Sequence, residues 1–331
     1  MSELNRCPLR RLGDLGKRAS GLQAGLGRGV LFAIALLSAV LGSPALLAQD
    51  DHSSILVLGR VSDDPKNHYA QLKPLLDYVV PRMHDVGIRE GRILMARDVQ
   101  QMTSYLRRGR VDWISETASA ALTYVQRGGG RMLVLTERSG VAEYRTVFFT
   151  RRDSGIQSLD DLRGHSIAFQ NPFSTSAYVA PAIQIMDAGL KLEVLLSPED
   201  RPAPDSVGYV FAQSEGNIAT WVHKRLADAG AFSNLDWEDL DGLPAHMKQD
   251  LVVIAEGEDY PRGVEVVRDG LPKAVSERLR EVLLEAGDDP AAREPLQRFF
   301  KTTRFLPMNE AAEEDLRRLS VGARRVHREL E

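Results

Sequence analysis

Short apolar runs that alternate with helical patterns constrain the fold of this chain most strongly. Four runs of strand length occur in the first half of the chain: Ile55–Leu58, Ile93–Ala96, Val111–Ile114 and Met132–Leu135. Segments with helical periodicity separate these runs: Leu72–Met83, Val99–Arg107 and Ser119–Arg127. Short apolar strands separated by helices favour βαβ units and mainly parallel sheets covered on both faces. The pattern therefore predicts an α/β fold.

Two longer β-prone passages predict that the chain crosses between two lobes. The first is Tyr144–Thr150, and the second runs from Leu251 to Val267. We expect a first part of lobe 1 at residues 49–147, lobe 2 at 148–252, and a return to lobe 1 with C-terminal helices at 253–331. The helical patterns of the last part lie near Pro272–Ala286, Pro290–Lys301 and Glu310–Leu330. Two lobes joined in this way enclose a cleft, where small-molecule sites usually lie.

The first 48 residues have the order of a secretory signal peptide. Six basic residues precede the apolar run Val30–Leu41, Gly42–Pro44 breaks it, and Leu46–Ala48 offers a cleavage site. The apolar run is shorter than the roughly 20 residues of a membrane span. Counting the weaker residues through Ala48 leaves an uncleaved anchor as the alternative. We expect export to the periplasm and removal of residues 1–48.

Composition narrows the classes of partner. The formal charge of the whole chain is −4, and the leader carries a surplus of basic residues, so the remainder has about −8. An acidic protein is a poor candidate for nucleic acid or anionic lipid. The only cysteine, Cys7, lies in the leader, so the mature chain can form no disulfide.

The segment Asn171–Tyr178 is the strongest candidate binding element. It follows the strand-like run Ser166–Phe169 and precedes a helical pattern, which places Ser174, Thr175 and Ser176 at a helix N-terminus. Free N–H groups and the positive end of the helix dipole attract an anion there. An ordinary helix cap is the alternative, although three consecutive hydroxyls exceed what a cap requires. Tyr178, one turn into the helix, is a candidate ligand contact or a core residue.

These features resemble the periplasmic solute-binding proteins of phosphate, phosphite and phosphonate ABC transporters. The resemblance spans most of the chain after the leader. Its main blocks are Leu72–Val79, Leu106–Trp113, Asp153–Gly164 with Ile167–Phe169, the Ser174–Ser176 turn, Val207–Val210 and Gly230–Asn234. The resemblance implies the two-lobed class II periplasmic binding protein fold with two hinge crossings. It also implies that Ser174, Thr175 and Ser176 hold the phosphate or phosphonate oxygens of a ligand delivered to an ABC permease.

The chain departs from the family at other expected ligand contacts. After the segment like Arg110–Trp113, an aromatic contact is replaced by Glu116 and Thr117. Ser214 lies where phosphonate binders have a histidine, and Asn234 replaces an acidic residue. These four positions are candidate ligand contacts.

The acidic departures affect the expected ligand. If Glu116 and Glu215 both face the cleft and are ionised, they repel a dianion strongly at low effective dielectric. The ligand could then be a different oxyanion, or a zwitterion whose cationic part meets one glutamate.

Two further candidates follow the first strand. Arg60 lies at its carboxyl end and could supply a cation to an anionic ligand. An exposed loop arginine fits the sequence equally well. Tyr69 could line the cleft, or it could cap the next helix together with His68.

Other chemistries have weak support in the sequence. The seven histidines show no pair at metal-ligand spacing, and the acidic cluster from Asp236 to Asp241 fails the calcium-loop pattern. Ser174 has no nucleophile elbow and no obvious base. We therefore expect no metal, no cofactor and no enzyme activity, in a monomer. The alternative function is a sensory module that presents its liganded form to a membrane sensor such as a histidine kinase.

Overall fold

The structure, a computed structural model, describes residues 54–239 and 243–330. Residues 50–331 form one compact unit. The leader lies outside the described residues, so its cleavage stays a prediction. Among the described ranges, no helix combines the length and the apolar character that crossing a membrane requires.

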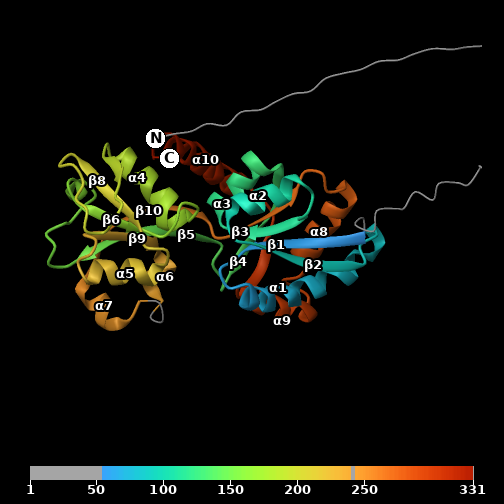
Figure 1. The fold of residues 1–331 in the computed structure, drawn as a ribbon. Coiled ribbons are helices and arrows are strands. Elements are labelled where there is room, and N and C mark those ends of the chain that lie inside the picture. Colours follow the sequence, from blue (N-terminus) through green and yellow to red (C-terminus); the bar gives the residue numbers. More distant parts are fainter. Residues whose placement is uncertain (1–53, 240–242, 331) are drawn as a thin grey trace, which may run out of the picture. The chain divides into compact units, whose positions relative to one another are not determined.

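The first sheet contains six strands in the order β12-β4-β11-β3-β1-β2 (Figure 1). Their bounds are β1 Ile55–Val61, β2 Glu90–Ala96, β3 Trp113–Glu116, β4 Gly130–Arg138, β11 Val264–Arg268 and β12 Thr302–Leu306. Strand β1 pairs in parallel with β2 and β3, whereas β11 pairs antiparallel with β3 and β4. The helices around this sheet are α1 Pro65–Val79, η2 Val80–Val86, α2 Val99–Arg107, α3 Ala118–Thr123, η3 Tyr124–Gly128, α8 Lys273–Glu285, η6 Pro290–Ala292 and α9 Arg293–Arg298. This sheet and its helices are called lobe 1.

The second sheet also contains six strands, in the order β10-β5-β9-β6-β8-β7. Their bounds are β5 Glu143–Arg151, β6 Ser166–Phe169, β7 Lys191–Val194, β8 Ser206–Phe211, β9 Ala229–Ser233 and β10 Leu251–Pro261. Strand β6 pairs in parallel with β8 and β9, and β5 pairs antiparallel with β9 and β10. The helices are η4 Asp160–Leu162, η5 Thr175–Val179, α4 Ala180–Asp187, α5 Glu215–His223, α6 Asn234–Glu238 and α7 Ala245–Asp250. This sheet and its helices are called lobe 2.

The two-lobed α/β architecture predicted from the sequence is confirmed. The chain passes from lobe 1 to lobe 2 between β4 and β5, and it returns between β10 and β11. Both sheets are mixed, because the strands next to these crossings, β5, β10 and β11, run antiparallel to their neighbours.

The backbone conformation of a few residues at helix ends explains where the structure agrees with the elements predicted from the sequence and where it differs. Gly129 ends η3 with φ 67°, the left-handed conformation that glycine adopts readily after a helix. The predicted helix through Lys301 ends at Arg298 instead, because Phe300 and Lys301 have positive φ angles of 54° and 55°. Strand β12, which follows this turn, was not predicted.

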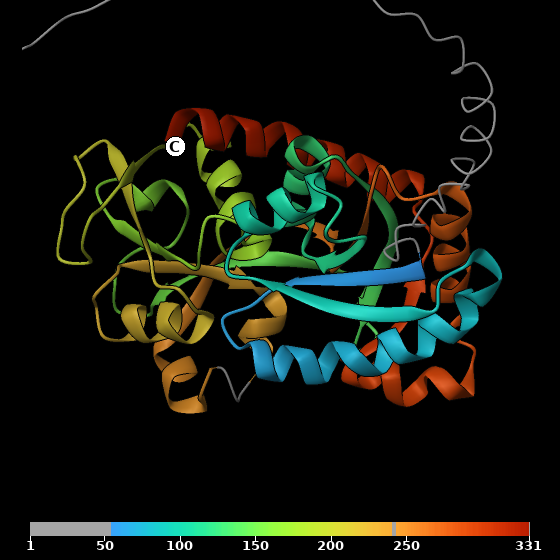
Figure 2. The ribbon, with the colours of Figure 1, turned by 45° about the vertical axis from the view of Figure 1, so that its right-hand side comes forward.

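The C-terminal helix α10 (Glu310–Leu330) links the two lobes (Figure 2). It packs against α3 of lobe 1 and against α4 and β10 of lobe 2. Its buried Leu316 and Leu319 belong to an apolar core that contains both Ile114 of lobe 1 and Ile167 of lobe 2. A Cβ atom on Gly322 would lie 2.7 Å from Cγ1 of Ile183 in α4, so this helix pair needs a glycine.

Candidate ligand-binding site

A cavity of about 630 Å³, here called the interlobe cavity, lies at the carboxyl ends of strands from both sheets. Lobe 1 contributes Arg60–Asp63, His68, Arg97–Val99, Glu116, Thr117, Ala120 and Arg138. Lobe 2 and the crossings contribute Tyr144, Gln170–Ser174, Ser176, Gln213, Glu215, Asp236 and Arg262. Ligands of open α/β sheets bind outside the carboxyl ends of the strands, so this cavity is the candidate site.

Three arginines converge on this cavity. Arg60 is near the end of β1, Arg138 is the last residue of β4, and Arg262 lies in the return crossing. Among the described residues, the buried Nε atom of each has no hydrogen-bond partner. Nη1 of Arg60 donates to the carbonyl of Ser115 at 2.9 Å and lies 3.5 Å from a carboxylate oxygen of Glu116. The cluster therefore retains buried donors that can serve an anion.

Aromatic rings hold these guanidinium groups in place. The Cζ atoms of Arg60 and Arg138 lie 4.8 and 4.9 Å from the centre of the Phe300 ring, and that of Arg262 lies 5.0 Å from Tyr144. Stacking on a ring leaves the edge of a guanidinium available for hydrogen bonds. Burial, followed by the charges of Arg262 and Arg60, lowers the pKa of Arg138 to about 10, which leaves it protonated at neutral pH.

Glu265 places a negative charge behind the arginines. It is fully buried and accepts hydrogen bonds from Trp113 Nε1 at 2.5 Å and from the hydroxyls of Ser115 and Thr136 at 2.7 Å. Burial raises the pKa of Glu265, and these three hydrogen bonds oppose the increase. The nearby charge of Glu265 stabilises the protonated form of Arg138.

Of the three hydroxyl side chains in the predicted turn, two line the interlobe cavity and the third makes a structural contact. Ser174 and Ser176 line the interlobe cavity, and the hydroxyl of Ser174 also accepts from the backbone N–H of Ala177 as a helix cap. Thr175 is only 1% exposed and does not line the cavity. Its hydroxyl accepts from the backbone N–H of Ser119 at 2.9 Å, which joins lobe 2 to lobe 1.

Three other predicted residues, Arg60, Glu116 and Thr117, line the interlobe cavity. Because Glu116 lies beside Arg60, part of its charge is compensated.

The two predicted tyrosines lie outside the cavity lining. Tyr178 is 1% exposed and packs its ring against Phe169 and Phe211 in the core of lobe 2. Tyr69 is 48% exposed on α1. The core alternative therefore describes Tyr178 better than a ligand contact does.

Ser214 and Asn234 also lie outside the lining. The hydroxyl of Ser214 caps α5 by accepting from the N–H of Asn217. The side-chain oxygen of Asn234 accepts from the N–H of Arg145 at 3.0 Å. Both side chains thus serve local structure.

Lobe 2 adds an acidic wall. Glu215 and Asp236 both line the cavity. Burial raises the pKa of Glu215, the charge of Asp236 adds to the increase, and the charge of Arg262 opposes it. The cavity therefore has cationic and acidic regions.

Sequence reasoning missed Arg138 and Arg262. Arg138 immediately precedes the first crossing, and Arg262 lies in the second. A basic residue at a predicted crossing was therefore the sequence feature that could have indicated these two residues.

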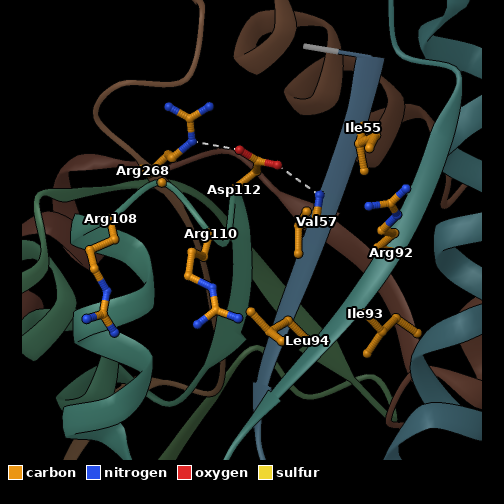
Figure 3. Close-up of a pocket in the computed structure, with 10 residues that line it drawn as sticks. Ile55, Val57, Arg92, Ile93, Leu94, Arg108, Arg110, Asp112 and Arg268 are labelled. Carbon is orange, nitrogen blue, oxygen red and sulfur yellow. Dashed lines mark hydrogen bonds and ion pairs between the residues drawn. The ribbon is translucent and has the colours of Figure 1, made fainter. Parts of the chain in front are cut away.

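A second cavity, of about 480 Å³, lies within lobe 1 near the start of β1 (Figure 3). Four arginines and apolar residues such as Val57 and Leu94 line it. Figure 3 shows Asp112 between Arg268 and the backbone N–H of Val57, at 2.6 and 2.8 Å. These contacts tie β3 to β11 and β1, so they have a structural role. The interlobe cavity is the better candidate because both lobes contribute polar groups to it.

No group of metal-binding side chains occurs among the residues that the structure describes. Two α/β lobes, two crossings and a polar cavity between strand ends define a two-lobed solute-binding protein.

The chain belongs to the periplasmic phosphonate substrate-binding family of ABC transporters. The family model described as "ABC transporter, phosphonate, periplasmic substrate-binding protein" matches residues 61–312. Members of this family are periplasmic transport proteins that work with a small-molecule ligand and an ABC permease.

Solved structures agree with this assignment. XAC2383 from Xanthomonas citri, bound to chloride ion, is 52% identical with a TM-score of 0.81, over 83% of this chain and 99% of that one. The same protein bound to ATP is 51% identical with a TM-score of 0.81, over 84% and 100%. PhnD1 from Prochlorococcus marinus, in complex with methylphosphonate, is 14% identical with a TM-score of 0.61, over 83% and 99%, and supports the fold alone.

Proposed function

We propose that this protein captures a phosphate- or phosphonate-type oxyanion in the interlobe cavity and delivers it to an ABC permease. The observation that carries the proposal is the convergence of Arg60, Arg138 and Arg262, each with a buried and unpartnered Nε among the described residues. An oxyanion offers several acceptors to such donors, and charge-assisted hydrogen bonds are about twice as strong as neutral ones. Ser174 and Ser176 would complete the oxygen contacts from lobe 2.

The structures of a relative support an anionic ligand. XAC2383 is described as bound to chloride in one structure and to ATP in another. The ion pair of Arg60 with Glu116 reduces the repulsion of a dianion. Glu215 and Asp236 lie on the acidic wall, where they would accept a cationic group of the same ligand.

The proposal includes export and a monomeric state. Residues 1–48 would direct the chain to the periplasm and be removed there. Capture would involve closure of the lobes about the two crossings, stabilised by contacts that the ligand makes with both lobes.

A ligand screen tests the proposal. The purified 50–331 unit should melt at a higher temperature with phosphate, phosphite, methylphosphonate or an alkylsulfonate, because a ligand of the native state raises its apparent stability. Absence of a shift with every one of these anions would contradict the proposal.

Arg262→Gln tests the site itself. Loss of a charge-assisted hydrogen bond costs about 1.5–3 kcal/mol, which corresponds to a fall in affinity of roughly tenfold or more. Arg225→Gln is the matched control, since Arg225 is exposed and pairs with Asp153 outside the cavity. Equal affinities of the two variants, measured by calorimetry, would place the site elsewhere.

The second candidate function is a sensory module read by a membrane sensor. The departures from the family's ligand contacts at Glu116, Ser214 and Asn234 favour this alternative. Uptake of radiolabelled ligand in cells with and without the protein separates the two. Unchanged uptake together with a lost transcriptional or second-messenger response would favour sensing.

A further inference from the structure

A third cavity adjoins the interlobe cavity. It has a volume of about 400 Å³ and shares Arg138 and Arg262 with the interlobe cavity. Its other main lining residues are Gln71, Arg298, Phe300 and Lys301. This space is called the basal cavity. Arg138 and Arg262 therefore border both cavities.

Unpartnered polar atoms gather at this junction. Seven buried side-chain nitrogen or oxygen atoms lack a hydrogen-bond partner within the described ranges. Three of them are the Nε–H donors of Arg60, Arg138 and Arg262. Buried polar groups without partners are uncommon and costly, so their concentration in one place indicates a ligand with many acceptors.

The basal cavity is more cationic than the interlobe cavity. Its lining contains Arg138, Arg262, Arg298 and Lys301 and no carboxylate, whereas the interlobe lining contains five carboxylates. Glu294 pairs with Arg298 at 3.1 Å, but no carboxylate of the described residues forms an ion pair with Lys301. Negative charge on a ligand is therefore favoured towards Lys301.

A strained turn places the key side chains. Phe300 and Lys301 both have positive φ, which is rare for side chains of this size and is often found at functional sites. The N–H of Lys301 donates to the carbonyl of Gln297 at 3.1 Å, and the carbonyl of Lys301 accepts from the N–H of Ser139 at 2.7 Å. This turn sets the Phe300 ring against two cavity arginines and brings Lys301 to the lining.

We propose that the ligand is an oligophosphate, either free or as an ester, that extends from the interlobe cavity into the basal cavity. Arg60, Arg138 and Arg262 bind the phosphate in the interlobe cavity, and Lys301 with Arg298 binds the distal phosphates. Arg138 and Arg262 contact neighbouring phosphates, because the planar guanidinium offers several donors in fixed directions. This inference rests on the proposed function and specifies the ligand of the same site.

Calorimetry of the 50–331 unit with inorganic phosphate, pyrophosphate and tripolyphosphate, in a metal-free buffer, tests this inference. We expect the affinity to rise at least tenfold from phosphate to tripolyphosphate. Lys301→Asn should reduce tripolyphosphate affinity about tenfold and leave phosphate affinity unchanged. Asparagine tolerates positive φ, so the turn is preserved. Lys301→Arg should restore most of the affinity.

The exposed Lys224 of lobe 2 supplies the control, and Lys224→Asn should bind all three probes normally. Phosphate or methylphosphonate binding with no gain for tripolyphosphate would overturn this inference and leave the proposed function intact. An equal loss for phosphate and tripolyphosphate in a folded Lys301→Asn variant would also overturn it. If no oxyanion binds, the proposed function fails as well.

Discussion

Glu215 is a partly buried carboxylate on the acidic wall of the interlobe cavity, and it links stability to pH. Its pKa in the folded chain is raised above the ordinary value of 4.5, first by burial and then by Asp236. The folded state therefore keeps this proton to a higher pH than the unfolded state does. The contribution of Glu215 to stability is full below about pH 4.5 and is lost as pH rises through the raised pKa.

Glu215→Gln should remove this dependence. We expect the variant to match the parent at pH 4 and to be more stable at pH 7–8, where the parent carries a buried charge. Urea unfolding across this pH range measures the difference. Glu143→Gln, at an exposed position of β5, is the control. A stability difference that does not change with pH would contradict the assignment.

For single residues, the sequence predicted which side-chain types form the site better than it predicted where each side chain lies. Ser174, Ser176, Arg60, Glu116 and Thr117 line the interlobe cavity, because residues after parallel strands reach the same sheet edge. The sequence could not show that Thr175 would bond to lobe 1, since that contact depends on how the two lobes meet.

Arg138 and Arg262 illustrate the same limit. They are 124 positions apart in the chain and converge only because β4 and the return crossing meet at one edge of the first sheet. No pattern of neighbouring residues in the sequence indicates that these two arginines lie close together in the fold.

The contact between η5 and α3 is a test at the scale of elements. Thr175→Val removes the acceptor of the buried Ser119 N–H and should destabilise the protein by about 1–3 kcal/mol. Thr175→Ser keeps the hydroxyl and should cost clearly less. Denaturant unfolding of both variants measures the effect, and equal losses would show that the methyl group matters as much as the hydrogen bond, which would contradict this prediction.

The packing of α10 on α4 is a second test at this scale. Gly322→Leu forces a side chain into Ile183 and should cost about 1–3 kcal/mol by overpacking. Adding Ile183→Ala should recover part of that loss, because it opens space for the new side chain. A double-mutant cycle in urea gives the coupling free energy, and purely additive losses would contradict the close contact.

The elements best predicted from the sequence have strong local signals. The helix at Glu310–Leu330 has the bounds predicted, and the strand Ser166–Phe169 is present as expected. Strand β12 was missed because it is short and is defined by its antiparallel pairing with β4, which is a tertiary contact. The turn before β12 interrupts the predicted helix at Phe300. Phe300 has a positive φ although it is not a glycine, so the sequence does not indicate a turn there.

The whole molecule should unfold as one unit. One apolar core cluster runs from residues of lobe 1 through α10 to residues of lobe 2, and each lobe also has a cluster of its own. We expect one calorimetric transition for residues 50–331, with equal van't Hoff and calorimetric enthalpies. Gly322→Leu should broaden or split this transition by weakening the contact of α10 with α4. Two transitions in the unaltered protein would contradict the shared core.

Two of the arginines that line the interlobe cavity lie at the two crossings, and this arrangement is useful for sensor design. Arg138 immediately precedes the first crossing, and Arg262 lies within the second. Gly140, in the first crossing, has φ 77°, and a Cβ atom added there would meet no other atom within 4 Å, so this position has room for an insertion. A circularly permuted fluorescent protein inserted at Gly140 would sit two residues from Arg138, for which we propose a ligand contact, and its brightness should then report occupancy of the cavity.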